Sequence, residues 1–195
     1  MTIKQGRHLA VIDMQRVFAE PASPWFTPRF AEVVEPIRRL VTAFGGRVTF
    51  TRFVAPEVPA GAWQRYYEQW PFALQPPDAP IYELADGMTR GDDPPNPPAP
   101  HSGSFAPART LDATTFGKWG PELAGEVGDG GLVLAGVSTD CCVLSTALAA
   151  ADAGVPVQVV ADACAGVNDE THRQALDIMR LYAPLVEVVT LSDVL

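Results

Sequence analysis

Two adjacent thiols, Cys141 and Cys142, lie in the stretch from Gly131 to Gly154. The apolar segment just before them, Leu132 to Val137, has the length of a buried strand, and the Leu- and Ala-rich residues after them predict a helix. The thiols are therefore expected in the first turn of a helix, where free N–H groups and the helix dipole favour an anion. A thiol in that place can have a lowered pKa and act as a nucleophile. The alternative is that both thiols only pack the junction.

A carboxylate, Asp13, directly follows a second apolar segment, His8 to Ile12. Catalytic groups gather at the carboxyl ends of strands in a parallel sheet. If the two strands are neighbours, Asp13 can act as general base for the Cys142 thiol. Backbone N–H groups from Ser138 to Cys142 can then stabilise an oxyanion, which suits attack on a carbonyl or imine-like carbon through a thioester-type intermediate. Asp13 could instead cap the turn after its strand.

Strand-like and helix-like segments alternate along most of the chain and predict an α/β fold. In such a fold a parallel sheet is covered by helices on both faces, with right-handed crossovers. Besides the segments above, we predict strands at 47–53, 108–112, 155–161 and 185–190, and helices at 28–44, 121–127, 143–153 and 169–182. The length of 195 residues suits a single domain, 1–195.

Residues 54–107 interrupt this alternation with an insertion rich in proline and aromatic residues. Trp63, Tyr66, Tyr67 and Trp70 fall at helical spacing, which favours a small helix that packs its aromatic face on the domain. A subunit contact or the wall of an aromatic-lined pocket are the alternatives.

Four aromatic residues are candidates for contact with a small-molecule substrate: Phe18, Trp25, Trp63 and Trp119. Such rings would suit a planar or apolar ligand. His101, at the end of the insertion, is a further candidate for catalysis, although a loop histidine is most often simply exposed.

The composition excludes several classes of function. A net charge of −9 and a pI of about 4.7, with no basic cluster, argue against a nucleic-acid partner. Three cysteines without a CxxC pair form neither a disulfide framework nor a zinc motif, which indicates a reducing compartment. The chain also shows no signal peptide and no apolar run near the roughly 20 residues that span a membrane. We therefore expect a cytoplasmic protein without a membrane partner.

Three motifs together resemble the isochorismatase-like cysteine hydrolase superfamily: VIDMQ at 11–15, GVSTDCCV at 136–143 and VVADACAG at 159–166. That superfamily includes nicotinamidases, enzymes like N-carbamoylsarcosine amidase and ureidoacrylate amidase, and isochorismatases. The resemblance covers nearly the whole chain in the expected order. It implies a doubly wound six-stranded parallel sheet of order 3-2-1-4-5-6 and a homo-oligomer, either a dimer or a tetramer.

The resemblance also implies roles for single residues. Cys142, and not Cys141, takes the place of the nucleophile in GVSTDCCV, and Asp13 takes that of the general base. A cis peptide is implied between Val137 and Ser138, which would aim the N–H groups of Ser138 and Cys142 at the oxyanion. The implied activity is cofactor-free hydrolysis of a C–N bond, of amide or carbamoyl type, in a small metabolite.

The third catalytic residue of the family is a lysine, and at this position the sequence departs from the family pattern. The segment ATTFGKWGPEL places Ala113 at the lysine position, with Lys118 five residues later. Either Lys118 reaches the site from a shifted position, or the chain works without the lysine. In the second case the protein would catalyse a non-amide reaction, such as ether hydrolysis on this fold, or would be a binding or scaffold protein that has lost catalysis.

A second departure concerns metal. Nicotinamidases carry an Asp-x-His type of metal site after the second strand, whereas TRFVAP at 51–56 offers neither a histidine nor a second carboxylate. We therefore expect no metal and a substrate other than nicotinamide. Isochorismatases usually lack the cysteine, so Cys142 argues against their vinyl-ether chemistry.

Overall fold

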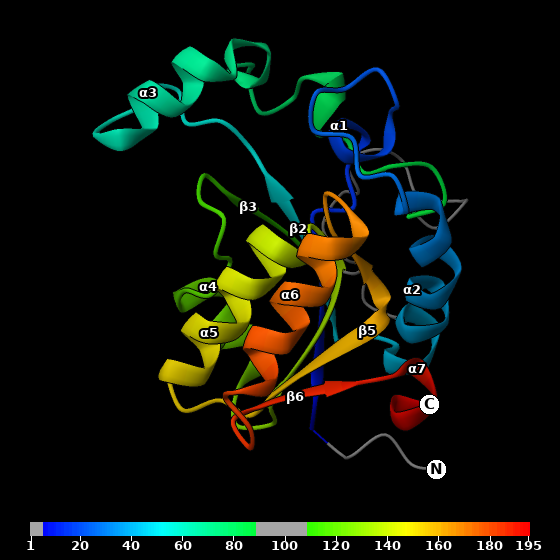
Figure 1. Cartoon of the computed structure of the whole chain (residues 1–195). Coiled ribbons are helices and arrows are strands. Elements are labelled where there is room, and N and C mark those ends of the chain that lie inside the picture. Colours follow the sequence, from blue (N-terminus) through cyan, green and yellow to red (C-terminus); the bar gives the residue numbers. More distant parts are fainter. Residues whose placement is uncertain (1–5, 89–108) are drawn as a thin grey trace, which may run out of the picture.

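A parallel sheet of six strands in the order β3-β2-β1-β4-β5-β6 runs through the centre of the molecule (Figure 1). The computed structural model describes residues 6–88 and 109–195. The strands are β1 (His8–Ile12), β2 (Val48–Phe53), β3 (Arg109–Ala113), β4 (Leu132–Val137), β5 (Val157–Ala165) and β6 (Val186–Val189). The predicted α/β class and strand order are confirmed.

Helices cover both faces of this sheet, as predicted (Figure 1). The α-helices of the described ranges are α1 (Arg16–Ala19), α2 (Phe30–Phe44), α3 (Ala62–Gln69), α4 (Pro121–Val127), α5 (Leu144–Asp152), α6 (Asp169–Arg180) and α7 (Leu191–Val194). Helices α2 and α7 pack on one face, while α4, α5 and α6 pack on the other. None of the helices in 6–88 and 109–195 is both long and apolar enough to cross a bilayer.

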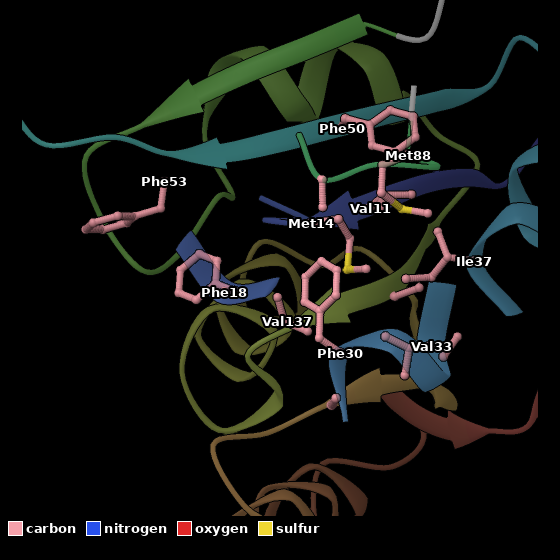
Figure 2. Packing of buried hydrophobic residues seen from close by; sticks show 14 of the residues in the cluster. Val11, Met14, Phe18, Phe30, Val33, Ile37, Phe50, Phe53, Met88 and Val137 are labelled. Carbon is pink, nitrogen blue, oxygen red and sulfur yellow. The ribbon is translucent and has the colours of Figure 1, made fainter. Parts of the chain in front are cut away.

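The central strand β1 shows why a strand of this sheet is apolar at successive positions of the sequence. Its side chains alternate between the two clusters of buried residues, with Leu9 and Val11 in one and Ala10 and Ile12 in the other. All five of its residues are buried, because helices cover both sides of a parallel sheet. Figure 2 shows the first cluster, in which Val11 lies among side chains of α2 and β2.

The structure corrects several predicted boundaries. An α-helix was expected directly after β4, but a π-helical turn, Thr139–Val143, comes first and α5 begins only at Leu144. The N–H of Val143 donates to the carbonyl oxygen of Ser138 at 3.1 Å, which is the wider spacing of a π turn. Strand β5 continues to Ala165, four residues beyond the predicted end. The short helix α7 was not predicted at all.

The predicted insertion contains α3 and two single turns of 3-10 helix, Pro71–Ala73 and Pro80–Tyr82. The predicted small aromatic helix is therefore present. Figure 1 shows α3 at the upper edge of the molecule, beyond the carboxyl end of β2. Residues 89–107 of the insertion, including His101, lie outside the described residues.

Candidate active site

Strands β1 and β4 are neighbours in the sheet, so Asp13 and Cys142 emerge at the same edge. Ile12 pairs with Gly136 across the two strands. Gly136 has a φ of +118°, and a Cβ there would lie 2.1 Å from the carbonyl oxygen of Ile12. Only glycine allows this close approach. The glycine of the GVSTDCCV motif, at the end of β4, thus brings the turn that carries Cys142 beside the residue that follows β1.

The Asp13 carboxylate is fully buried and is held on one oxygen by Thr51 of β2. The Thr51 hydroxyl donates to Asp13 Oδ1 at 2.7 Å, and the N–H of Asp13 donates to Thr51 Oγ1 at 3.2 Å. Asp13 adopts a φ of +48°, a left-handed conformation that aspartate tolerates better than most residues. The sequence contained no local signal for Thr51, because it lies 38 residues from Asp13.

The second oxygen of Asp13 faces Lys118. The distance from Lys118 Nζ to Asp13 Oδ2 is 2.9 Å, and their side chains are 1% and 0% exposed. Nζ also donates to the carbonyl oxygen of Thr115 at 2.8 Å and lies 5.0 Å from the centre of the Phe53 ring. Lys118 thus reaches Asp13 from the loop after β3, whereas Ala113 ends β3 and pairs with Phe53 in the sheet.

Thr146 of α5 links the lysine loop to the turn that carries Cys142. Its hydroxyl donates to the carbonyl oxygen of Cys142 at 2.7 Å and accepts from the N–H of Lys118 at 2.9 Å. Thr146 is fully buried. One side chain therefore fixes the backbones of two candidate catalytic residues relative to each other, and sequence analysis did not identify it.

The environment of Cys142 corrects the expectation of a lowered pKa. Burial raises the pKa of the Cys142 thiol well above its ordinary value, and the neighbouring Asp13 carboxylate raises it further. The Lys118 ammonium acts in the opposite direction. Cys142 is only 3% exposed. The loss of hydration therefore raises the pKa of its thiol by more than the nearby helix end could lower it. The thiol is therefore protonated near neutral pH, and a nearby base is needed to activate it.

The backbone before the thiols has the conformation that the resemblance implied, because the peptide bond between Val137 and Ser138 is cis. The turn is tied to the start of α6 through Asp140. The carboxylate of Asp140 accepts hydrogen bonds from the hydroxyls of Ser138 and Thr171, and from the N–H of Val167 at 3.1 Å. Asp140 thus joins two segments around the site.

A cavity of about 310 Å³ opens beside Cys142, and Ser138 and Cys141 also line it. Its aromatic lining comprises Phe18, Trp25, Phe26, Phe53, Tyr66, Trp70 and Phe116. Two of the four aromatic candidates, Phe18 and Trp25, thus border the cavity.

The other two aromatic candidates lie elsewhere. Trp63 packs behind the cavity wall, with its ring 5.3 Å from that of Phe116 and 5.1 Å from that of Tyr66. Trp119 lines a different cavity, beside Asp112 and Pro121. Phe116 was not identified from the sequence, because a single aromatic residue in a loop carries no periodic signal.

The segment 51–56, where a metal site was considered, begins within β2 and includes an ion-paired arginine. Arg52 forms an ion pair with Asp112 of β3 at 2.6 Å. Within the part of the chain that the structure describes, no three His, Cys, Asp or Glu side chains lie close enough together to bind a metal ion.

Comparison with known proteins agrees with this architecture. No curated protein matches the sequence. A cysteine hydrolase from Pseudomonas syringae pv. phaseolicola 1448A superposes with a TM-score of 0.75 at 20% identity, over 97% of this chain and 90% of that chain. An isochorismatase family protein from Desulfovibrio vulgaris subsp. vulgaris str. Hildenborough gives 0.75 at 22% identity, over 96% and 95%. N-carbamoylsarcosine amidase from Thermoplasma acidophilum gives 0.68 at 20% identity, over 95% and 96%.

At such identities these structures establish the fold alone. The sequence itself matches the family model described as the isochorismatase domain, over residues 8–193. This match includes all three motifs of the sequence analysis and both strands that carry Asp13 and Cys142. The chain therefore belongs to the isochorismatase family of hydrolases.

Proposed function

We propose that this protein is a cysteine-dependent hydrolase that cleaves the C–N bond of a small amide or carbamoyl compound. The observation that supports it most directly is the buried pair of Asp13 and Lys118 beside the buried thiol of Cys142. A carboxylate, an ammonium group and a thiol that meet next to a cavity provide a base, a compensating charge and a nucleophile.

The first half of the reaction forms a thioester. Asp13 takes the proton of the Cys142 thiol, and the sulfur attacks the carbonyl carbon of the substrate. The backbone N–H groups of Ser138 and Cys142 stabilise the negative charge that develops on the carbonyl oxygen. When the C–N bond breaks, Asp13 returns the proton to the departing nitrogen, so that ammonia or an amine leaves.

The second half releases the acid. Asp13 takes a proton from a water molecule, whose oxygen attacks the thioester carbon. The carbon–sulfur bond then breaks, and the proton held by Asp13 returns to the Cys142 sulfur. This route uses only groups of the chain and water.

The positive charge of Lys118 favours this proton transfer. Its ammonium group compensates the buried charge of Asp13 in the resting state, at 2.9 Å. It also lowers the pKa of the Cys142 thiol, against the effects of burial and of Asp13. The same positive charge therefore favours both the carboxylate that accepts the proton and the thiolate that results from its transfer.

A panel of small primary amides and carbamoyl compounds tests the proposal. Release of ammonia should be accompanied, after rapid acid quenching, by an acyl group on the tryptic peptide that contains Cys142. An acyl group on another residue, or hydrolysis that never loads Cys142, would contradict the proposal. We also propose a homo-oligomer, as the family resemblance predicts, and light scattering of the purified protein measures it directly.

Replacing Asp13 by asparagine should separate the role of Asp13 as proton acceptor from the effect of its charge on the pKa of Cys142. Because the Asp13 charge raises the pKa of Cys142 and Lys118 lowers it, the D13N variant should hold more thiolate at a given pH. Alkylation of Cys142 by iodoacetamide at pH 8 should therefore be faster than in the wild type, while amide turnover falls by about 10³-fold because the proton acceptor is lost. Peptide mapping by mass spectrometry across pH 6–10 measures the alkylation.

The control for this variant is D112N, which removes a carboxylate that pairs with Arg52 outside the site. It should leave both the alkylation profile and the turnover unchanged. If D13N instead left the alkylation profile of Cys142 where it is in the wild type, Asp13 would not be coupled to the thiol.

Replacing Thr51 by valine should lower kcat by about tenfold, because the hydroxyl that holds Asp13 Oδ1 at 2.7 Å is removed. The control is T49V, two residues earlier on the same strand. The Thr49 hydroxyl is equally buried but bonds to the His8 ring at 2.8 Å, away from Asp13. Steady-state kinetics of both variants should show the loss only in T51V, and equal losses would refute the specific role of Thr51.

A further inference from the structure

The third motif, VVADACAG at 159–166, ends in a glycine that brings the start of α6 against the π-helical turn Thr139–Val143. A Cβ on Gly166 would lie 3.0 Å from the Cβ of His172 and 3.2 Å from Asp140 Oδ2. These separations are shorter than ordinary van der Waals contacts, so a larger residue would push α6 away from the turn. Glycine at this position therefore lets α6 lie directly beside the turn.

The first turn of α6 has a fixed position. The side chain of Asn168 caps the helix, because its Oδ1 accepts from the N–H of Thr171 at 2.9 Å. The carbonyl oxygen of Asn168 accepts from the N–H of His172 at 3.0 Å. The hydroxyl of Thr171 donates to the Asp140 carboxylate. The backbone that carries His172 is therefore held next to the turn that carries Cys142.

One side chain of α6 bonds directly to a side chain of this turn. Nδ1 of His172 lies 2.8 Å from the hydroxyl oxygen of Thr139. Thr139 is fully buried, and among residues 6–88 and 109–195 its hydroxyl has no other hydrogen-bond partner. A buried hydroxyl proton needs an acceptor, so Nδ1 accepts this bond and the ring carries its own proton on Nε2. His172 therefore bonds to the turn in its neutral form.

The surroundings of His172 favour the neutral ring. Burial lowers the pKa of His172 below its ordinary value, and the guanidinium of Arg29 on α2 lowers it further. Two carboxylates raise this pKa and a second guanidinium lowers it, each less strongly than burial: Asp140, Asp169 and Arg180. Three further titratable groups line the same cavity as the ring: Glu32, Asp162 and Cys164. The imidazole is therefore uncharged at neutral pH and takes up a proton only in acid.

We propose that His172 is a positioning residue for the hydrolysis, because its bond to Thr139 holds the π-helical turn in the conformation that presents the Cys142 sulfur and the neighbouring N–H groups. This inference rests on the proposed function, since it takes Cys142 as the nucleophile. Protonation of the ring puts a hydrogen on Nδ1, so the buried Thr139 hydroxyl loses its acceptor. The turn then loses a bond that orders it, and turnover falls in acid as the neutral fraction of His172 decreases.

Replacing His172 by alanine should lower kcat by about tenfold, which is the scale of one lost hydrogen bond to a buried group. KM should change little, because His172 does not line the cavity beside Cys142. H172N places an amide at the position of Nδ1 and should restore most of the lost kcat, whereas the longer side chain of H172Q should not. The comparison of H172N with H172Q decides the question even if H172A does not fold.

The pH profile of kcat separates this role from a merely structural one. The acid limb of the wild-type profile should move to lower pH in H172N, because an amide does not titrate. If H172N fails to restore kcat, or if it keeps the acid limb of the wild type, the inference is wrong.

Hydrogen exchange reports on the turn without any turnover. In the wild type the N–H groups of Cys141 and Val143 donate to the Ser138 carbonyl oxygen, at 3.2 and 3.1 Å. Mass spectrometry of the peptide that contains residues 138–143 should show faster exchange in H172A and wild-type exchange in H172N. Equal exchange in all three proteins would contradict the inference.

The matched control is H8A, at the opposite end of β1 from Asp13. His8 is also buried with a lowered pKa, and its Nε2 lies 2.8 Å from the Thr49 hydroxyl oxygen. Loss of this bond should lower the melting temperature about as much as H172A does, and leave kcat, its pH profile and the exchange of the turn unchanged. Equal losses of kcat in H8A and H172A would overturn the inference, because general destabilisation would then explain both.

The C142A variant distinguishes this inference from the proposed function. If C142A abolishes turnover while H172A keeps the wild-type kcat and H172N the wild-type acid limb, the proposed function stands and this inference falls. If C142A retains turnover while H172A speeds exchange of the turn, the proposed hydrolysis falls and the ordering of the turn by His172 stands.

Discussion

Replacing Cys142 by alanine should lower kcat for the amide substrate by about 10⁴-fold or more, which is the scale on which loss of a covalent nucleophile acts. The substitution removes the sulfur that would form the thioester and leaves the Asp13–Lys118 pair intact. Although Cys142 is buried, only one sulfur atom is removed, so the substitution should cost only modest stability. Ammonia release measures the turnover, and mass spectrometry of the quenched protein should find no acyl group.

The two other thiols provide matched controls. Cys141 lines the same cavity but is partly exposed, and Cys164 is buried on β5. C141A and C164A should both retain turnover within about tenfold of the wild type. An isochorismatase-like ether hydrolase would behave differently, since its activity would survive the loss of Cys142 but not the loss of Asp13. That pattern in the variants would overturn the cysteine mechanism.

The fold could be predicted from the sequence because each strand leaves its own local signal. Apolar segments such as His8 to Ile12 are buried on both faces, and their alternation with helices leaves few arrangements for a parallel sheet. The three motifs then supplied the strand order through the family resemblance. The prediction that Asp13 and Cys142 share one edge followed from that order and from general rules on strand ends, and the pairing of β1 with β4 confirms it.

The contacts that shape the site could not be predicted in this way. Thr51 and Lys118 reach Asp13 from distant parts of the sequence. Thr146 lies only four residues from Cys142, but nothing in its own segment indicates that it also bonds to the backbone of Lys118. The sequence left open whether Lys118 reaches the site, because alignment with the motif puts the family lysine at Ala113 and the contact of Lys118 with Asp13 depends on the path of the loop after β3. The direction of the Cys142 pKa was wrongly expected for a similar reason, because burial is a property of the folded chain and outweighs a helix end.

Replacing Lys118 by methionine should be the most destabilising of the substitutions considered, because it leaves the Asp13 carboxylate buried without a compensating charge. Breaking one side of such a buried pair costs about 3–5 kcal/mol of the free energy of unfolding. Turnover should fall by at least about 10²-fold, because the positive charge that favours both the carboxylate and the thiolate is gone. Urea unfolding followed by circular dichroism, together with steady-state kinetics, measures both effects.

A double variant separates the charge effect from a simple loss of packing. In K118M/D13N no buried charge remains, so most of the lost stability should return while turnover stays abolished. The control is R52M, which breaks the partly exposed pair with Asp112 at the same end of the sheet and should cost about 1 kcal/mol or less. If K118M were no more destabilising than R52M, or if D13N gave it no relief, the ion pair at 2.9 Å would not be what holds Asp13 charged beside Cys142.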